Sequence, residues 1–374
     1  MLKNRFQSEI LFSGYYGQLN TGDDAFIEVS SWGADKYWNK TNILFLAKKE
    51  KLPESCLPIR GYPFNMPRTL SLQSKLLVSS TNYLISAGGS ILCSKFNSKD
   101  IKHLALKEKK KHQRIKLGAI GVSIGPFKTI EDEKAIVNYL MNLNFLSVRD
   151  QASFDYLTSL DLPYKPINAF DLAALLPNIY GIEKNASYIH MNKKVVGISV
   201  CPVESISGIN VESEAIRNNK TIDLLKLLDK NDNIHFKFFI INGHQIIGDH
   251  KITQEIINKV LPSSYEIIDY SRKTKFMWDQ INSCDFVIST RLHAAIFACF
   301  SNIPFMLNEY HRKCSDFLDN VGYNFEYRLF NNEYDVVETS KTIINILRGG
   351  VYKVPTKVNE MKIKSELNFT EVKI

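Results

Sequence analysis

The sequence FVISTRLHAAIFA, residues 286–298, indicates the fold class of the chain most clearly. Three apolar residues that favour β-structure lead into Ser289 and Thr290, and an alanine-rich segment with apolar residues at helical spacing follows. This pattern predicts a buried strand, a tight turn with a hydroxyl N-cap, and a helix whose first turn contains Arg291 and His293.

The start of this predicted helix has the chemistry of an anion-binding site. Backbone N–H groups in a first turn lack an intrahelical acceptor, and the helix dipole adds to their attraction for anions. Arg291 supplies a planar guanidinium that matches phosphate or carboxylate, and His293 can give or take a proton near neutral pH. One interpretation is a site where an anionic small molecule binds and reacts. The alternative is a surface arginine and a hydrogen-bonded histidine in an ordinary α/β unit.

Length and composition are those of a globular protein with two domains. The chain has 374 residues, of which 44% are hydrophobic and 23% charged. No apolar run approaches the roughly 18–20 residues that cross a bilayer, and residues 1–9 lack the apolar segment of a signal peptide. We therefore expect a cytoplasmic location. The cysteines form no CxxC pair, so we expect neither a zinc site nor a disulfide framework.

The net charge of +8 is concentrated in one basic segment, KEKKKHQRIK at residues 107–116. No aromatic residue interleaves this segment, so we expect no nucleic-acid partner. A solvated helix face is one interpretation. The alternative is contact with anionic lipid head groups, which would place the protein peripherally at the inner face of a membrane.

The first predicted strand, residues 10–13, runs into the glycine-rich segment GYYGQLNTGDDA at residues 14–25, and a helix is expected over 26–38. This order is that of a Rossmann-like half, although the spacing is not the dinucleotide pattern GxGxxG. Glycines let the backbone approach a ligand closely. Asp23 or Asp24 is expected to cap the helix, which leaves the other aspartate to face a cleft.

Short apolar segments then alternate with longer mixed ones. Further strands are expected at 42–47, 83–87, 117–124, 145–150 and 167–170, with helices at 131–142 and from about 151. Strands that end at glycines, as at Gly88 and Gly89, mark the edge where open α/β sheets bind ligands. Arg149 lies at the end of an expected strand, where a plain ion pair at a helix start is the alternative role.

The alternation restarts after a predicted boundary at residues 176–193. Strands are expected at 194–200, 235–241, 266–268, 286–288 and 303–307, and His244 lies in the loop after the second of them. The tail from Tyr352 either frays or returns to the first domain. We predict an α/β, GT-B-like protein with two Rossmann-like domains, residues 1–180 and 181–374, that face each other across a cleft.

Several motifs occur in the order in which a known family carries them. They are GYYGQLNTGDDA, SAGGS, GVSIGP, SVRD and STRLHAAIFAC, followed by Pro304 and NEYHRKCSDFL at residues 308–318. Over about residues 10–322 the chain resembles the polysaccharide pyruvyl transferase family. Members look like GT-B proteins that transfer pyruvate from phosphoenolpyruvate to two hydroxyls of one sugar, forming a cyclic ketal and releasing phosphate. The resemblance implies an enzyme of exopolysaccharide or capsule synthesis, with the acceptor on 1–180 and the donor on 181–374.

The resemblance also implies roles for individual residues. His293 is the expected general acid, and Asp24 or His244 would accept the hydroxyl proton. The expected phosphoenolpyruvate-binding residues are Arg149, Ser289, Arg291, Leu292 and Lys313. The expected residues of the acceptor side or the cleft are Gly17, Asn20, Gly22, Asp23, Gly88, Gly89 and His244. No metal or cofactor is expected, and the saccharide acceptor is either a free glycan, a polymer or a lipid-linked intermediate.

Two segments depart from the family pattern. Gly88 and Gly89 stand where members often carry three glycines, and Asp171 precedes Leu-Ala where many members have Asp-Pro. Both departures bear on acceptor geometry more than on donor binding. Two other functions stay open: a GT-B glycosyltransferase that uses a nucleotide sugar, and a non-catalytic scaffold in polysaccharide assembly.

Overall fold

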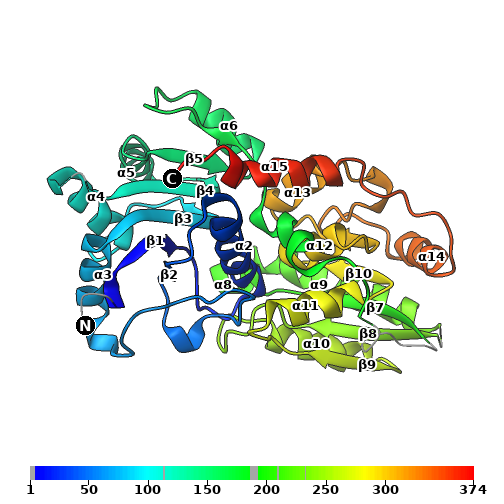
Figure 1. Cartoon of the computed structure of the whole chain (residues 1–374). Helices are drawn as coiled ribbons and strands as arrows, with labels where there is room; N and C mark the ends of the chain where they lie inside the picture. Colours follow the sequence, from blue (N-terminus) through cyan, green and yellow to red (C-terminus); the bar gives the residue numbers. More distant parts are fainter. Residues whose placement is uncertain (1–4, 113, 186–192, 209, 232) are drawn as a thin grey trace. The chain divides into compact units, whose positions relative to one another are not determined.

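A computed structural model describes residues 5–112, 114–185, 193–208, 210–231 and 233–374 (Figure 1). The chain forms two compact units. Unit 1 contains Met1–Gly17, Asp23–Leu175 and Met361–Ile374; unit 2 contains Gln18–Gly22 and Leu176–Glu360. The main passage between the units is thus at 175/176, and two short segments belong to a unit other than the one expected from the ranges 1–180 and 181–374. The predicted boundary segment includes residues 186–192, which lie outside the described residues.

Unit 1 contains a parallel sheet in the order β2-β1-β3-β4-β5-β6 among the described residues. Its strands are β1 Ser8–Ser13, β2 Ile43–Phe45, β3 Thr81–Leu92, β4 Lys116–Ile124, β5 Phe145–Val148 and β6 Ile167–Asn168. Its helices are α2 Thr21–Trp38, α3 Leu70–Ser79, α4 Ile101–His112, α5 Ile130–Leu140, α6 Gln151–Thr158 and α15 Val358–Thr370. The first two residues of α2 and the first three of α15 belong to unit 2.

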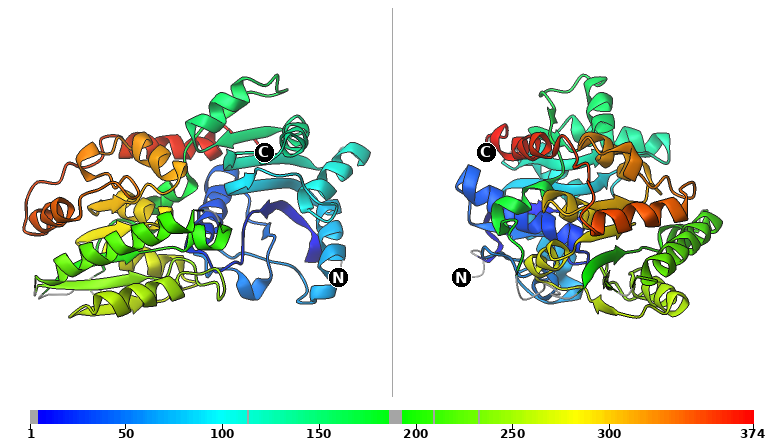
Figure 2. Two further views of the ribbon diagram at one scale, coloured as in Figure 1. Left: turned by 180° about the vertical axis from the view of Figure 1, so that it is seen from behind. Right: turned by 90° about the vertical axis from the view of Figure 1, so that its right-hand side faces the viewer.

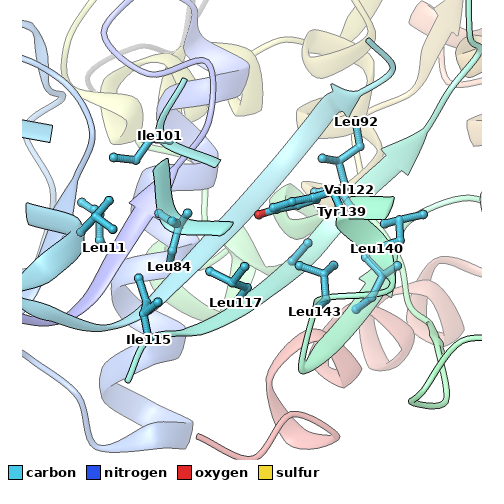
Figure 3. Close-up of a cluster of buried hydrophobic side chains, with 14 of the residues drawn as sticks. Leu11, Leu84, Leu92, Ile101, Ile115, Leu117, Val122, Tyr139, Leu140 and Leu143 are labelled. Carbon is cyan, nitrogen blue, oxygen red and sulfur yellow. The ribbon is translucent and has the colours of Figure 1, made fainter. Parts of the chain in front are cut away.

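The two faces of this sheet follow from the alternation of side chains along each strand. Leu11, Leu84 and Leu117 are fully buried on the face that α3, α4, α5 and α6 cover, as Figure 3 shows for part of this core. Burial of each such side chain contributes about 1.5–3 kcal/mol of transfer free energy. In β5, Ser147 follows the buried Leu146 and points to the opposite face, where its hydroxyl donates to Asn368 of α15 at 2.6 Å. Helix α15 and strand β1, far apart in the sequence, therefore belong to the same unit.

Unit 2 contains a second parallel sheet, in the order β11-β10-β7-β8-β9 among the described residues (Figure 2). Its strands are β7 Lys194–Ser199, β8 Ile234–Phe239, β9 Tyr265–Ile268, β10 Phe286–Ser289 and β11 Phe305–Leu307. Its helices are α7 Leu176–Tyr180, α8 Val203–Ser207, α9 Val211–Asp229, α10 His250–Val260, α11 Thr274–Asn282, α12 Leu292–Phe300, α13 Arg312–Asn320 and α14 Val336–Leu347. Two parallel sheets with alternating helices confirm the predicted α/β class.

Three local predictions need correction. Strand β3 does not end before Gly88 but runs through both glycines to Leu92. Helix α2 begins at Thr21, so Asp23 and Asp24 lie in its first turn and do not cap it. Helix α12 begins at Leu292 with Arg291 as its N-cap and without a side-chain cap hydrogen bond. The hydroxyl of Ser289 instead donates to the carbonyl of Arg291 at 2.6 Å, which stabilises the turn itself.

Within the described residues, no helix has both the length and the apolar character needed to cross a membrane.

Candidate functional site

The carboxyl ends of the parallel strands in unit 2 carry the residues of the candidate site. Strand β10 leads to Arg291 and His293, β7 to Cys201, β8 to Asn242, and β11 to Tyr310. These strands are parallel neighbours, so their carboxyl ends lie at one edge of the sheet. The hydrogen bonds between β10 and β7 continue just past the end of β10, where the Thr290 N–H donates to the carbonyl of Ser199 at 2.7 Å.

Asp249 holds the guanidinium of Arg291 at this edge. Nε of Arg291 lies 3.0 and 3.2 Å from the two carboxylate oxygens of Asp249, and Nη2 makes a further short contact. Asp249 is fully buried, whereas 17% of the Arg291 side chain is exposed. Burial raises the pKa of Asp249, and the nearby Arg291 acts in the opposite direction. One edge of the guanidinium is thus fixed by protein, and Nη1 has no hydrogen-bond acceptor within the described part of unit 2.

A segment from the start of the chain packs against His293. Gln18–Gly22 lies along the extension of β8: Thr21 donates to the Ile241 carbonyl at 3.0 Å, and Gly243 donates to the Leu19 carbonyl at 2.8 Å. Asn20 pairs with Asn242 in an antiparallel bridge, and its side chain accepts the N–H of Gly22 at 3.0 Å.

Gly22 then lies directly against the imidazole of His293. A Cβ atom at Gly22 would lie 2.0 Å from Nδ1 of His293, a distance that no side chain tolerates. Asn20 and Gly22, both predicted as site residues from the sequence, are therefore brought to His293 within unit 2.

Lys313 reaches the same edge through Tyr310. Its Nζ lies 5.7 Å from the centroid of the Tyr310 ring, and the guanidinium carbon of Arg217 lies 5.2 Å from it. Arg217 is buried and makes two 2.6 Å hydrogen bonds to the carboxylate of Glu204. Burial raises the pKa of the Tyr310 hydroxyl well above its usual value, so the ring stays neutral beside these cations. The result is a cationic edge formed by Arg291 and Lys313.

Ser289 and Leu292 serve the backbone of the turn. Both are buried, and the Ser289 hydroxyl bonds the Arg291 carbonyl as described above. Leu292 is the first residue of α12, so the backbone N–H groups that begin there lack intrahelical acceptors. An anion at this helix start would meet those groups and the positive end of the helix dipole.

His244 has a geometry that favours a proton donor over a base. Its Nδ1 accepts the backbone N–H groups of Ile246 and Ile247 at 3.2 and 3.3 Å. A neutral imidazole that accepts at Nδ1 carries its proton on Nε2, which is then a donor. This hydrogen bonding argues against His244 as the general base, and the role of Asp24 stays a prediction.

Arg149 lies in unit 1 and is extensively hydrogen-bonded there. Its Nη1 donates to Asp171 at 2.7 Å, Nε to Ser123 at 2.9 Å, and Nη2 to Ser90 at 3.2 Å. Only 9% of the side chain is exposed. These bonds join β3, β4 and the end of β6, so they account for an arginine at this position by structure alone. Binding of a donor substrate by Arg149 stays a prediction.

The other predicted residues of unit 1 are two aspartates of α2 and three glycines. Asp24 is buried and Asp23 half-buried in its first turn. Gly17 and Gly88 both have positive φ angles, at which glycine is favoured. A Cβ atom at Gly88 would lie 2.3 Å from the Phe26 ring, so this glycine lets α2 pack on β3. A Cβ atom at Gly89 would make ordinary van der Waals contact, since its nearest neighbour would be the Ile91 side chain at 3.6 Å.

The predicted residues thus divide between the units. Unit 2 brings together one group: Asn20, Gly22, His244, Ser289, Arg291, Leu292, His293 and Lys313. Unit 1 holds Gly17, Asp23, Asp24, Gly88, Gly89 and Arg149. Sequence reasoning missed Asp249 and Tyr310. Asp249 directly follows a glycine after the loop that contains His244, and this pattern is typical of an ordinary helix cap.

Two cavities lie elsewhere. One of about 690 Å³ in unit 1 is lined by Tyr83, Lys116 and Phe145, at the amino-terminal ends of the strands. The other, of about 250 Å³ in unit 2, lies between α9 and α10. Neither touches the residues of the cationic edge.

A family model described as polysaccharide pyruvyl transferase matches residues 18–312. The chain belongs to the polysaccharide pyruvyl transferase family. The match covers both the segment that packs on His293 and the helix start at Arg291, and it confirms the family named from the sequence. No curated protein sequence matches the chain.

Two solved structures that resemble this fold are UDP-GlcNAc 2-epimerases. The UDP-GlcNAc 2-epimerase from Neisseria meningitidis, solved with UDP-GlcNAc, has a TM-score of 0.58 at 10% identity, over 96% of this chain and 98% of that chain. The UDP-GlcNAc 2-epimerase from Methanocaldococcus jannaschii has a TM-score of 0.60 at 12% identity, over 96% and 97%. At these identities the likeness concerns the fold, and it confirms the GT-B-like architecture of two Rossmann-like domains.

Proposed function

We propose that this polysaccharide pyruvyl transferase moves the pyruvyl group of phosphoenolpyruvate onto two hydroxyls of one sugar, forming a cyclic ketal and releasing phosphate. The acceptor is a saccharide of a cell-surface polysaccharide or its precursor, either polymeric or lipid-linked. Beside the family, one observation carries the proposal: Arg291, fixed by Asp249, lies at the start of the same helix as His293. This arrangement offers an anion two kinds of donor next to a group that can supply a proton.

The proposed donor has two anionic groups, and the cationic edge of unit 2 suits both. Arg291 can offer Nη1 to a phosphate or carboxylate while Asp249 keeps the opposite edge of the guanidinium in place. Lys313 adds a point charge, and the first turn of α12 adds backbone donors. We assign Arg149 the same role as a proposal from the resemblance. The proposed reaction requires no metal ion or cofactor, because arginine and a helix start can hold the anion.

The chemistry begins with proton transfer to the methylene carbon of phosphoenolpyruvate, which becomes the methyl group of the product. His293 donates this proton while a sugar hydroxyl bonds the adjacent carbon and gives its own proton to a base, for which Asp24 is our candidate. The bond between that carbon and the phosphate oxygen then breaks, and phosphate takes the electron pair. Attack by the second hydroxyl on the same carbon closes the ketal ring, and the proton of that hydroxyl goes to the departing phosphate.

Binding of phosphoenolpyruvate is the first test. A ligand at about 100 times its dissociation constant stabilises the folded protein by about 2.7 kcal/mol, which raises the melting temperature measurably. We expect this response in the wild type and in His293→Ala, and we expect Lys313→Gln and the double variant Arg291→Met/Asp249→Asn to lose it. The double variant avoids leaving Asp249 buried without its cation.

Turnover distinguishes the proposal from its alternatives. With a saccharide acceptor, phosphate release should fall at least 100-fold in His293→Ala, since general acid catalysis contributes about 10²–10⁴-fold. The bound UDP-GlcNAc of the Neisseria epimerase suggests a nucleotide sugar as a second candidate donor. Stabilisation by UDP-sugars without any by phosphoenolpyruvate would favour that candidate. Intact polymer synthesis in cells that carry His293→Ala would indicate a scaffold.

A further inference from the structure

The outer surface of α4 in unit 1 is strongly basic. Lys107, Lys110 and Lys111 are exposed near the carboxyl end of this helix, and Arg114 is exposed just after it. Glu108 is the acidic residue within this turn, and one of its carboxylate oxygens lies 4.0 Å from Nε2 of the neighbouring His112. We call Lys107, Lys110, Lys111 and Arg114 the basic patch.

The neighbouring helix α3 exposes large apolar side chains. Leu72 is 59% exposed and Leu76 39%, and they are four positions apart, so they lie on one face of the helix. Met66, just before α3, is 59% exposed. On the opposite face Leu77 and Val78 are buried in the core. Helix α3 packs against α4, and Figures 1 and 2 show the two side by side.

The topology brings the basic and apolar groups to one surface. Helix α3 leads into β3 and α4 leads into β4, and the two strands are parallel, so both helices end at the amino-terminal edge of the sheet. Both also cover the same face of the sheet. Lys109 fixes the end of α4, since its Nζ donates to the Asn142 carbonyl at 2.7 Å and to Asn144 Oδ1 at 2.9 Å. Leu76 and the basic patch therefore share the outer surface of one helix layer.

We propose that this α3–α4 surface docks on a bilayer that contains anionic phospholipids. Lysine and arginine near such a membrane are attracted to the phosphate head groups, and leucine and methionine side chains enter the boundary of the acyl chains. A nucleic acid would match the charges alone, and the basic segment lacks the aromatic side chains on which bases stack. Membrane docking through this surface does not depend on the reaction proposed above, because α3 and α4 belong to unit 1 whereas Arg291 and Lys313 belong to unit 2.

Co-sedimentation of the full-length protein with vesicles tests this proposal. We expect binding to vesicles of phosphatidylcholine mixed with phosphatidylglycerol, little binding to phosphatidylcholine alone, and release by high salt, which screens surface charges. Lys107→Gln/Lys110→Gln/Lys111→Gln should lower the partition coefficient about 100-fold, from the known attraction per lysine. Leu72→Asn/Leu76→Asn should lower it about 10-fold through lost apolar burial.

A matched control separates local from overall charge. Lys226, Lys230 and Lys259 are exposed in unit 2, and their replacement by Gln removes the same total charge. This control triple should bind as the wild type does, and all variants should keep the wild-type melting temperature within a few degrees. Equal loss in the control triple, equal binding to both kinds of vesicle, or no vesicle binding by the wild type would each overturn the proposal.

Discussion

Gly22 and His293 fit together without room for an additional methyl group. The glycine is the second residue of α2 and donates its N–H to Asn20, while the imidazole ring lies where a Cβ atom would project. Because Asn20 is bridged to Asn242, the backbone around Gly22 is held in place and cannot easily move away from the imidazole. The position of the candidate acid therefore depends on a residue far away in the sequence.

Gly22→Ala should displace His293 and lower turnover at least 10-fold. Alanine favours helix formation by about 1 kcal/mol over glycine, so the loss of activity should not come with a loss of helix. Phosphate release and the melting temperature are the measurements. Gly208→Ala is the matched control, since a Cβ atom there meets nothing within 4 Å and its φ of 70° strains alanine. The control should be slightly less stable but fully active; the reverse pattern would contradict the prediction.

The pair of Arg291 and Asp249 should respond asymmetrically to mutation. Arg291→Met alone leaves a fully buried carboxylate without its cation and should lower the free energy of unfolding by about 3–5 kcal/mol. Arg291→Met/Asp249→Asn removes both charges and keeps an acceptor for the Asn242 N–H, which Asp249 binds at 2.8 Å. The double variant should therefore be more stable than the single one in urea unfolding. Additive losses would show that the pair does not couple.

Sequence reasoning found some of these residues and missed others for a physical reason. Arg291 and His293 could be predicted because a strand, a turn and a helix start are local features. Asp249 lies 42 residues from Arg291, and its isolated pattern is that of a helix cap. Nothing in the local sequence of Asn20 and Gly22 shows that they contact β8 and α12. The family resemblance named them, the structure shows their contacts, and their functional role stays a prediction.

At the scale of elements, α8 and α9 are joined by a buried charge pair. Arg217 of α9 is 1% exposed and binds both carboxylate oxygens of Glu204 in α8. Burial alone would raise the pKa of Glu204, but Arg217 outweighs it and holds the pKa below its ordinary value. Arg217 also lies 5.2 Å from the centroid of the Tyr310 ring, which Lys313 contacts as well.

This pair predicts a specific acid sensitivity. A carboxyl group with a lowered pKa in the folded state stabilises that state fully above the unfolded value of 4.5, and the contribution is lost as the pH falls through the lower folded value. Glu204→Gln should cost about 3 kcal/mol at neutral pH and flatten the loss of stability below pH 4.5. Urea unfolding across this pH range measures both effects.

An exposed pair provides the control for this experiment. Glu338 and Lys341 lie 2.7 Å apart, and both side chains are about two-thirds exposed. Glu338→Gln should change stability by less than about 1 kcal/mol and leave the pH profile as in the wild type. Parallel profiles for Glu204→Gln and the wild type would contradict a role for the buried pair.

Individual elements were predicted best where apolar residues cluster. The strands of both sheets lie where buried β-forming residues run together, with ends that differ by a few residues. The prediction failed at Gly88 and Gly89, because glycine is commonly a turn residue. In β3 these two residues have positive φ and continue the strand, since the ring of Phe26 occupies the space beside Gly88. Packing against α2 overrides the local signal.

At the scale of the whole molecule, the chain passes between the two units more than once. It does so at 17/18, 22/23, 175/176 and 360/361. The last passage returns Met361–Ile374 to unit 1, one of the two alternatives for the tail. There Phe369 packs on Trp38 and against Gly33, and Asn368 binds the carbonyl of Phe170 at 2.9 Å. The local sequence of residues 361–374 does not predict these long-range contacts.

A chain that ends at residue 360 should lose stability in unit 1 alone. Without α15, the apolar surface around Trp38 becomes exposed and Ser147 loses its partner Asn368. Hydrogen exchange should then accelerate in α2, β4 and β5 and stay unchanged in β7 and β8. Phe369→Ala in the full-length chain should give a weaker form of the same pattern, with about 3–5 kcal/mol lost. Ile363→Ala, at an exposed position of α15, is the control. Faster exchange throughout both units would contradict the prediction that the stability of unit 2 does not depend on α15.

The return of α15 to unit 1 sets an order of events on the ribosome. Domains of a growing chain usually fold in the sequence in which they emerge, with the amino-terminal one first. Here β1 and α15 belong to the same unit, and the main body of unit 2 is synthesised between them. Unit 1 therefore stays incomplete, with part of one sheet face uncovered, until residues 361–374 have been synthesised. A chain released after residue 360 would carry a complete second unit and an incomplete first one.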